Sequence, residues 1–169
     1  ARNIGIKYSN GKYISFLDSG DTWCSNHINN FIHRSKEKKI LFYYGSYLNI
    51  KKNKTVLRIA KLHRNLTDLI TFNTIGTSSV IISKNIAEAF DEKLQLRHDI
   101  DLWYRLIRKL NKKDIYANND LSYLRYIHKG SLSYQLINKV VYQLKFFKKY
   151  YEKTYILLFC YLIIRHLIF

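Results

Sequence analysis

The chain has 169 residues, of which 47% are apolar and none is proline. This length and composition predict one folded unit with a sizeable core and no proline-marked linker. Lysine and arginine outnumber aspartate and glutamate by 29 to 12, so the formal net charge is +17. That excess fits a nucleic acid, an anionic membrane surface or a phosphorylated substrate as partner. It fits equally well a general enrichment in Lys, Asn, Ile and Tyr.

The two cysteines, Cys24 and Cys160, lie far apart in the sequence and outside any spacing typical of zinc ligands. They give no sign of a disulfide framework or a zinc site, and they favour a reducing cytoplasm.

Short strands alternate with helices along most of the chain, which predicts an α/β fold. The expected elements are, in chain order, a helix ending near Tyr8, a strand over 13–17, an acidic turn over 18–21, a helix from a Ser25 cap to Lys36, a strand over 39–50 broken at Gly45, a turn over 51–54, a return strand over 55–59, a short helix or turn over 65–72, a strand over 80–82 and a short helix over 84–90.

The clearest helix is predicted over 99–110, where apolar residues follow the spacing of one helix face. These residues are Trp103, Leu106, Ile107 and Leu110. On the other face Asp101 precedes Arg105 by four residues, which predicts an ion pair on the surface.

The end of the chain is basic and apolar. From residue 131 the pattern is helical, with one predicted apolar stripe made by Val140, Leu144, Phe147 and Tyr151 and with lysines away from it. Lysines among aromatic residues suit the surface of an anionic bilayer, and the stripe suits packing on the sheet, so both interpretations stay open. Residues 154–169 are nearly all apolar, but this run is shorter than a spanning helix needs.

The acidic turn follows directly on the strand over 13–17, where Asp18 and Asp21 stand on either side of Ser19-Gly20. Ligands of α/β proteins bind beyond the carboxyl ends of strands, and two acids there suit Mg²⁺ or Mn²⁺ with a diphosphate. The alternative is a plain turn, because Asp, Ser and Gly are also preferred in turns on conformational grounds.

Asp99 opens the predicted helix over 99–110, four residues before the core-facing Trp103. A carboxylate at a helix N-terminus is held by free backbone N–H groups and can act as a general base on a substrate hydroxyl. Its alternative role is to cap the helix. His98 directly precedes it and is a candidate on the acceptor side of the same site.

Three ordered blocks resemble family 2 glycosyltransferases, which are inverting enzymes of the GT-A fold. ARNIGIKYSNGKYISFLDSGDTW at 1–23 resembles the family's A-R-N-x-G and F-L-D-x-D-D-x-W pattern. TSSVIISKNIAEAFDEKLQLRHDIDLWYRL at 77–106 is similar to its S-S strand, F-D-E turn and E-D-x-D-L-W-x-R helix, and HKGSLS at 128–133 to its H-x-x-S-x-S. Several blocks in order make a more specific match than any one motif.

The resemblance implies a GT-A (Rossmann-like) mixed sheet flanked by helices, with a partial catalytic domain at 1–133 and a helical tail at 134–169. It implies transfer of a sugar from a nucleotide-sugar donor to a glycan or lipid-linked acceptor in surface polysaccharide synthesis, at the inner face of the cytoplasmic membrane. By analogy Asp18 and Asp21 bind the metal and the donor diphosphate, and Asp99 is the base. Trp103 and Arg105 match the helix pattern and are expected to be structural.

The sequence departs from the family pattern in ways that bear on the site. Gly20 stands where the family has its second metal-binding Asp, His98 replaces the Glu of the E-D pair, and Ala89 replaces a Gly. The family's first β-α-β region has no counterpart here, so we expect these residues alone not to bind a nucleotide sugar tightly. Two alternatives stay open, an inactive glycosyltransferase remnant and a basic nucleic-acid-binding module, although no nucleic-acid motif is present.

Overall fold

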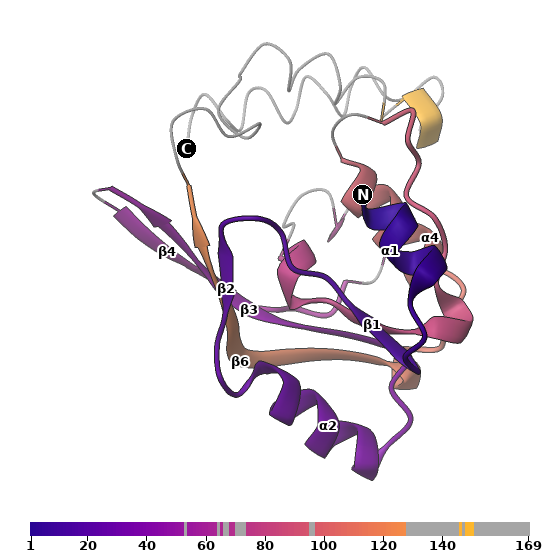
Figure 1. The fold of residues 1–169 in the computed structure, drawn as a ribbon, viewed down its shortest axis with the longest axis horizontal. Coiled ribbons are helices and arrows are strands. Elements are labelled where there is room, and N and C mark those ends of the chain that lie inside the picture. The colour runs from indigo at the N-terminus through magenta and orange to yellow at the C-terminus, as the bar shows by residue number, and fades with distance from the viewer. Residues whose placement is uncertain are drawn as a thin grey trace.

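The computed structural model describes residues 1–52, 54–63, 65, 68–69, 74–94, 97–127, 146 and 148–150. The strands in this part of the chain form one sheet in the order β1-β5-β3-β6-β2, with β4 paired to β3 (Figure 1). Their bounds are β1 Tyr13–Ser15, β2 Asp21–Trp23, β3 Phe42–Lys51, β4 Lys54–Arg58, β5 Ile81–Ser83 and β6 Ile115–Tyr126.

The sheet is mixed. β3 and β6 are parallel, whereas β5 is antiparallel to both β1 and β3, so β1, β3 and β6 all run in one direction. β2 and β4 run in the opposite direction, against β6 and β3. The carboxyl ends of β1, β3 and β6 therefore meet at one end of the sheet, which is where α/β proteins bind ligands. The predicted α/β class with a mixed sheet is confirmed.

Helices pack on both faces of the sheet. The longer helices of the described residues are α1 Arg2–Tyr8, α2 His27–Glu37 and α4 His98–Ile107. In Figure 1, α2 lies below the sheet, and α1 and α4 lie together on its other side. Phe31 of α2 packs on Tyr43 and Ile81, while Trp103 of α4 packs on Phe42 in a second and larger cluster.

The predicted break at Gly45 is a register shift inside a continuous strand. β3 runs through Gly45, but its pairing with β6 shifts between Gly45 and Tyr47. A Cβ on Gly45 would lie 1.8 Å from the Ser122 Oγ, so only glycine fits this close approach of the two strands. β-Bulges of this kind re-aim the side chains that follow them.

Three local predictions were wrong. The helix expected over 84–90 is a single 3₁₀ turn at Lys84–Ile86. The residue at the N-cap of α2 is Asn26 rather than Ser25, and its side chain makes no capping hydrogen bond. The first strand ends at Ser15, two residues before its predicted end.

The described residues of the tail pack against α4. Phe146 is buried, and the Tyr150 ring lies edge-on to Tyr104 at 5.3 Å between centroids. The predicted apolar stripe and the domain boundary at 133/134 lie outside the described residues, so both stay predictions. None of the described helices has the length and hydropathy needed to cross a bilayer.

Candidate functional site

The acidic turn is held in place by Ser78, which lies in a 3₁₀ turn at Thr77–Ser79. The Asp18 N–H donates to the Ser78 Oγ at 3.0 Å, and the Ser78 hydroxyl donates to the Asp21 carboxylate at 2.6 Å. The Trp23 indole N–H donates to the Ser78 carbonyl at 2.7 Å. One serine therefore fixes both predicted metal-binding acids and the start of β2.

Gly20 takes a backbone conformation that favours glycine. Its φ is +86°, and the Asp21 N–H donates to the Asp18 carbonyl at 3.0 Å, which closes the turn. A positive φ at the third residue of such a turn is the requirement of a type II turn. The turn interpretation of this stretch is thus confirmed, and it coexists with two carboxylates at the carboxyl end of β1.

α4 begins at the same end of the sheet, and Asp99 lies in its first turn. The Asp99 carboxylate accepts a hydrogen bond from the Ile100 N–H at 2.9 Å, and its side chain is half-buried. Arg97 at the N-cap has a left-handed backbone (φ 67°). Burial lowers the pKa of Arg97, and the negative charge of Asp99 opposes that shift, so the two groups lie within electrostatic reach.

Arg2 joins the acidic turn to the start of α4. Its Nε and Nη2 donate to the Asp18 Oδ1 at 3.2 and 2.5 Å, and its Nη1 contacts the His98 Nε2. The guanidinium also lies 5.3 Å from the centre of the Phe90 ring. The structure therefore brings Asp18 and His98, which are 80 positions apart in the sequence, to one cation. The roles predicted for them stay predictions.

Asn3 keeps Arg2 in this position. Its side-chain amide donates to the Phe90 carbonyl at 3.0 Å, and its carbonyl oxygen accepts from the Phe90 N–H at 2.7 Å. This pair of hydrogen bonds fastens α1 to the segment that leads into α4. The first residues of the chain thus form one wall of the site.

Two stacked tyrosines form its floor, with ring centroids of Tyr47 and Tyr123 4.9 Å apart. Burial raises the pKa of Tyr47; the charges of Arg125 and Arg58 lower it, and those of Asp99 and Asp21 raise it. Asp21 of the acidic turn and Asp99 therefore both act through their charges on the Tyr47 hydroxyl, although they lie far apart in the sequence.

Asp21 has a raised pKa. The main cause is burial, which outweighs the hydrogen bond from Ser78 and the charge of Arg125, while the nearby charge of Asp18 raises the pKa further. Two acids whose charges repel each other gain stability when a cation binds between them.

A groove of about 350 Å³ lies between α1 and β1. It is lined by apolar side chains, among them Ile6, Ile14 and Phe16, and by Arg2 and Asp18. This is a space that a substrate can enter beside the acidic turn.

Asp18 and Asp21 fit a divalent cation only in part. The described residues contain no group of three or more His, Cys, Asp or Glu side chains placed to hold a metal. Mg²⁺ is commonly held by one or two carboxylates while substrate phosphates and water complete its shell. The two acids suit that way of holding Mg²⁺, but in this structure the Asp18 Oδ1 accepts from Arg2.

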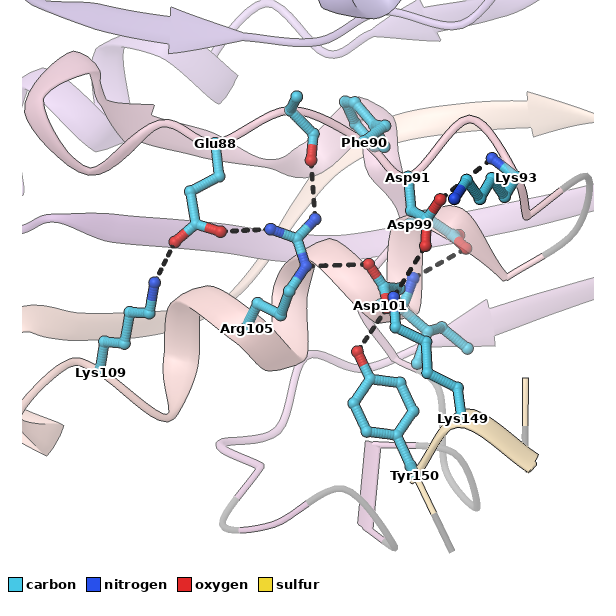
Figure 2. A network of polar contacts seen from close by, with 12 residues as sticks. Glu88, Phe90, Asp91, Lys93, Asp99, Asp101, Arg105, Lys109, Lys149 and Tyr150 are labelled. Atoms are coloured by element: carbon cyan, nitrogen blue, oxygen red, sulfur yellow. Dashed lines mark hydrogen bonds and ion pairs between the residues drawn. The ribbon is translucent and has the colours of Figure 1, made fainter. Parts of the chain in front are cut away.

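Asp101 lies on the other side of α4 and is fully buried. The predicted ion pair with Arg105 is confirmed, but its expected place on the surface was wrong. Figure 2 shows three donors converging on its carboxylate: the Arg105 Nε at 2.9 Å, the Lys149 Nζ at 2.6 Å and the Tyr150 hydroxyl. Burial alone raises the pKa of Asp101, but these hydrogen bonds outweigh burial and lower it.

Arg105 extends this network away from the site. It contacts Glu88, which also binds Lys109 at 2.5 Å, and it donates to the Ala89 carbonyl at 2.7 Å. Trp103 is fully buried in the core beside it. The prediction that Arg105 and Trp103 are structural is confirmed.

Sequence reasoning missed several residues of the site, namely Arg2, Tyr47, Ser78, Arg97, Tyr123 and Arg125. Arg2 and Ser78 belong to the quoted A-R-N and T-S-S blocks, so a signal was present. The tyrosines and Arg125 carried none, because their place depends on the pairing of β3 with β6.

The chain is similar to glycosyltransferases over most of its length. It is 30% identical over 151 residues to WfaP of Escherichia coli, named as a UDP-Glc:alpha-D-GlcNAc-diphosphoundecaprenol beta-1,3-glucosyltransferase, covering 85% of this chain and 57% of WfaP. WfgD of the same organism has the same printed activity and is 30% identical over 117 residues, with 66% and 44% covered. An uncharacterised glycosyltransferase of Rickettsia prowazekii is 26% identical over 155 residues, with 83% and 47% covered.

The chain thus spans about half the length of the curated relatives it matches. No protein-family model matches it.

Proposed function

We propose that the chain carries the catalytic region of an inverting family 2 glycosyltransferase with a GT-A fold. The observation that carries the proposal is the meeting of the acidic turn and the first turn of α4 at one end of the sheet. Arg2 contacts both Asp18 and His98 there, and the charges of Asp21 and Asp99 both raise the pKa of Tyr47. The similarity to two glucosyltransferases supports the same reaction class.

Asp99 is the proposed general base. It takes the proton of an acceptor hydroxyl, whose oxygen attacks the anomeric carbon on the side opposite the leaving diphosphate. The bond from that carbon to the diphosphate oxygen breaks, and the nucleoside diphosphate departs with the electron pair. Attack from the opposite side inverts the anomeric centre.

Asp18 and Asp21 are the proposed metal and diphosphate residues, with Mg²⁺ or Mn²⁺ as the ion. Bound there, the ion offsets negative charge on the diphosphate. If a cation were held at Asp18, the Arg2 guanidinium, which donates to Asp18 in this structure, would be available to a phosphate oxygen or an acceptor group. His98, which contacts Arg2, is the proposed residue on the acceptor side.

The proposed acceptor is a glycan on a lipid carrier, and the proposed location is the cytoplasmic face of a membrane, with surface polysaccharide as the product. WfaP and WfgD are named for a diphosphoundecaprenol-linked acceptor, which supports a lipid-linked substrate here. The basic tail remains a candidate for membrane contact. Deletion of residues 139–169 is the variant that tests it, with weaker vesicle binding as the expected result.

The proposal is tested by replacing Asp99 with asparagine in the intact protein. Transfer of radiolabelled hexose from UDP-sugars to a lipid-linked N-acetylglucosamine acceptor is measured with Mg²⁺ or Mn²⁺ present. We expect kcat/KM to fall roughly 10² to 10⁴-fold, the range for loss of a general base. Donor affinity should change little, since Asp99 acts on the acceptor.

The matched control is Asp120→Asn, which removes one carboxylate from an exposed position of β6. It should keep normal turnover. Normal turnover of Asp99→Asn would overturn the assignment of the base. A folded parent protein that transfers no hexose from any UDP-, GDP- or dTDP-sugar would favour an inactive remnant.

A further inference from the structure

One half of the sheet carries an apolar face that the described helices leave open. Side chains alternate along a strand, so Leu48 and Ile50 of β3 lie opposite the Tyr47 face that forms the floor of the site. Their pairing partners continue that face across the neighbouring strands. We call it the outer face, and its residues are Leu48, Ile50, Leu57, Leu124 and Tyr126.

The outer face belongs to neither core cluster of the described residues. None of its five side chains is buried, and Leu57 and Tyr126 are 52% and 41% exposed. Leu48, Ile50 and Leu124 are partly exposed. A contiguous group of large apolar side chains that are exposed or partly exposed marks a contact with a protein or a membrane.

The β3–β4 hairpin that carries this face is also basic. From residue 38 to residue 67 the chain has no acidic residue, and Lys51, Lys52 and Lys54 lie at the end of the hairpin with exposed side chains. In Figure 1 the hairpin projects at the left, away from α2 and α4. Its lysines are therefore free to approach a large flat partner.

We propose that the β3–β4 hairpin docks on an anionic lipid bilayer, with the outer face against the acyl boundary and the three lysines among the headgroups. Apolar side chains flanked by lysines match the two zones of such a surface. A second copy of the chain fits less well, because it would set the same lysines against one another. A nucleic acid fits less well because Leu and Ile offer no stacking surface for bases.

The position of the hairpin indicates how docking would help the enzyme reach its acceptor. This step rests on the function proposed above. Tyr47, in the floor of the site, pairs with Arg58 at the base of the hairpin. Lys51 is four residues further along β3, or about 13 Å at the rise of a strand. Docking would therefore hold the site within reach of an acceptor whose lipid lies in the bilayer.

The test is co-sedimentation of the intact protein with vesicles of phosphatidylcholine, with and without phosphatidylglycerol. We expect binding to the anionic vesicles only, weakened by salt. The triple variant K51Q/K52Q/K54Q should bind roughly tenfold or more weakly, given about 1 kcal/mol for each lysine near such a surface. Leu57→Gln should bind about fivefold more weakly through loss of apolar burial.

The matched control is K36Q/K39Q/K113Q, which removes the same charge from exposed lysines on and near α2 and in the 3₁₀ turn at Lys112–Asp114. It should bind nearly as well as the parent protein. Equal weakening in both triple variants, unchanged binding in the hairpin triple, or equal binding to neutral vesicles would each overturn the docking surface. So would a dimer in ultracentrifugation that Leu57→Gln dissociates.

Activity separates this proposal from the proposed function. The hairpin variants should lose transfer to a vesicle-embedded acceptor and keep transfer to a water-soluble acceptor with a short alkyl chain. Absence of transfer to both acceptors in the parent protein would refute the transferase while leaving vesicle binding as a separate readout. Loss of transfer to both acceptors in the hairpin variants alone would refute the docking role.

Discussion

Asp99 and Asp101 lie two residues apart in the first turn of α4 and have opposite surroundings. The Asp101 side chain is fully buried and accepts from Arg105, Lys149 and Tyr150. Asp99 is half-buried and, from the described residues, accepts one hydrogen bond, from the neighbouring Ile100 N–H. Residues two apart on a helix point to nearly opposite sides, so one turn serves both the core and the site.

The difference separates a structural acid from one available for chemistry. Three donors hold Asp101 ionised and in one orientation, and its burial makes those donors indispensable. Asp99 keeps lone pairs that a substrate hydroxyl can use. The number of donors around a carboxylate, rather than the motif that contains it, therefore distinguishes the two.

Asp101→Asn gives the largest expected effect on stability. The amide keeps the shape of the side chain, but its N–H₂ group is a donor placed among other donors. Lys149 and Arg105 also lose the negative charge that they bind. We expect the free energy of unfolding to fall by about 3 kcal/mol, measured by urea titration of tryptophan fluorescence. Asp99→Asn should change it by less than about 0.5 kcal/mol.

The acid limb of the stability curve gives an independent check. Because the pKa of Asp101 is lowered in the folded state, its contribution is present above the usual value of 3.8 and is lost as pH falls through the lower folded value. The Asp101→Asn variant should not show this acid-induced fall in the free energy of unfolding. Equal destabilisation by the Asp99 and Asp101 variants would remove the distinction between the two acids.

His27 extends the comparison to a buried group without partners. Its side chain is fully buried beside Trp23 and Tyr43, and neither ring nitrogen has a hydrogen-bond partner among the described residues. Burial lowers the pKa of His27 to about 4. Above pH 6.5 His27 is neutral in both the folded and the unfolded chain, so it costs the folded state nothing. As pH falls from 6.5 towards 4 only the unfolded chain takes up the proton, and the free energy of unfolding falls.

His27→Phe should abolish that loss, which amounts to roughly 2 to 3 kcal/mol between these pH values. The measurement is the unfolding free energy at several pH values between 7 and 4. His33→Phe, on an exposed position of the same helix, is the control, and it should keep the loss of stability that His27 causes because His27 stays in place. A parent curve that is flat in this range would contradict the burial of a neutral imidazole.

The sequence was sufficient for elements whose cause is local. The spacing of Trp103 and Leu106 predicted α4 because burial of one face imposes the helical period, and both residues are buried. The acidic turn was predicted because Gly20 and its neighbours have strong turn preferences. The resemblance implied that this turn and Asp99 belong to one site, and their shared role stays a prediction.

Features that depend on distant partners escaped prediction. β6 was not recognised because Asn118, Asn119 and Asp120 interrupt its apolar pattern where it shifts register against Gly45. The burial of Asp101 depends on Lys149, 48 residues away, and the contact of His98 with Arg2 spans 96 residues. No spacing within a single helix contains that information.

Lys149→Met tests which lysine of the tail supports α4. Lys149 binds Asp91 at 2.8 Å and Asp101 at 2.6 Å, whereas Lys148 beside it makes no ion pair with the described residues. We expect Lys149→Met to lower the unfolding free energy by roughly 1 to 2 kcal/mol, since the lysine is partly solvated and the carboxylates keep other donors. Lys148→Met is the matched control and should have no measurable effect. A loss of the same size in both variants would show that Asp101 does not depend on this lysine.

Gly20→Asp has a smaller expected effect on stability than Asp101→Asn, and it bears on the acids of the site. The positive φ of Gly20 should cost about 1 kcal/mol for either Asp or Ala, because a Cβ disfavours that conformation while meeting no other atom. The two variants differ in charge. A third carboxylate beside Asp18 and Asp21 adds repulsion that Mg²⁺ or Mn²⁺ relieves, so the ion should raise the Tm of Gly20→Asp more than that of Gly20→Ala. Equal shifts in Tm would mean that the carboxylates of this turn do not bind one ion jointly. Asp99 would then be the one acid left to contrast with Asp101, whose carboxylate accepts from three donors.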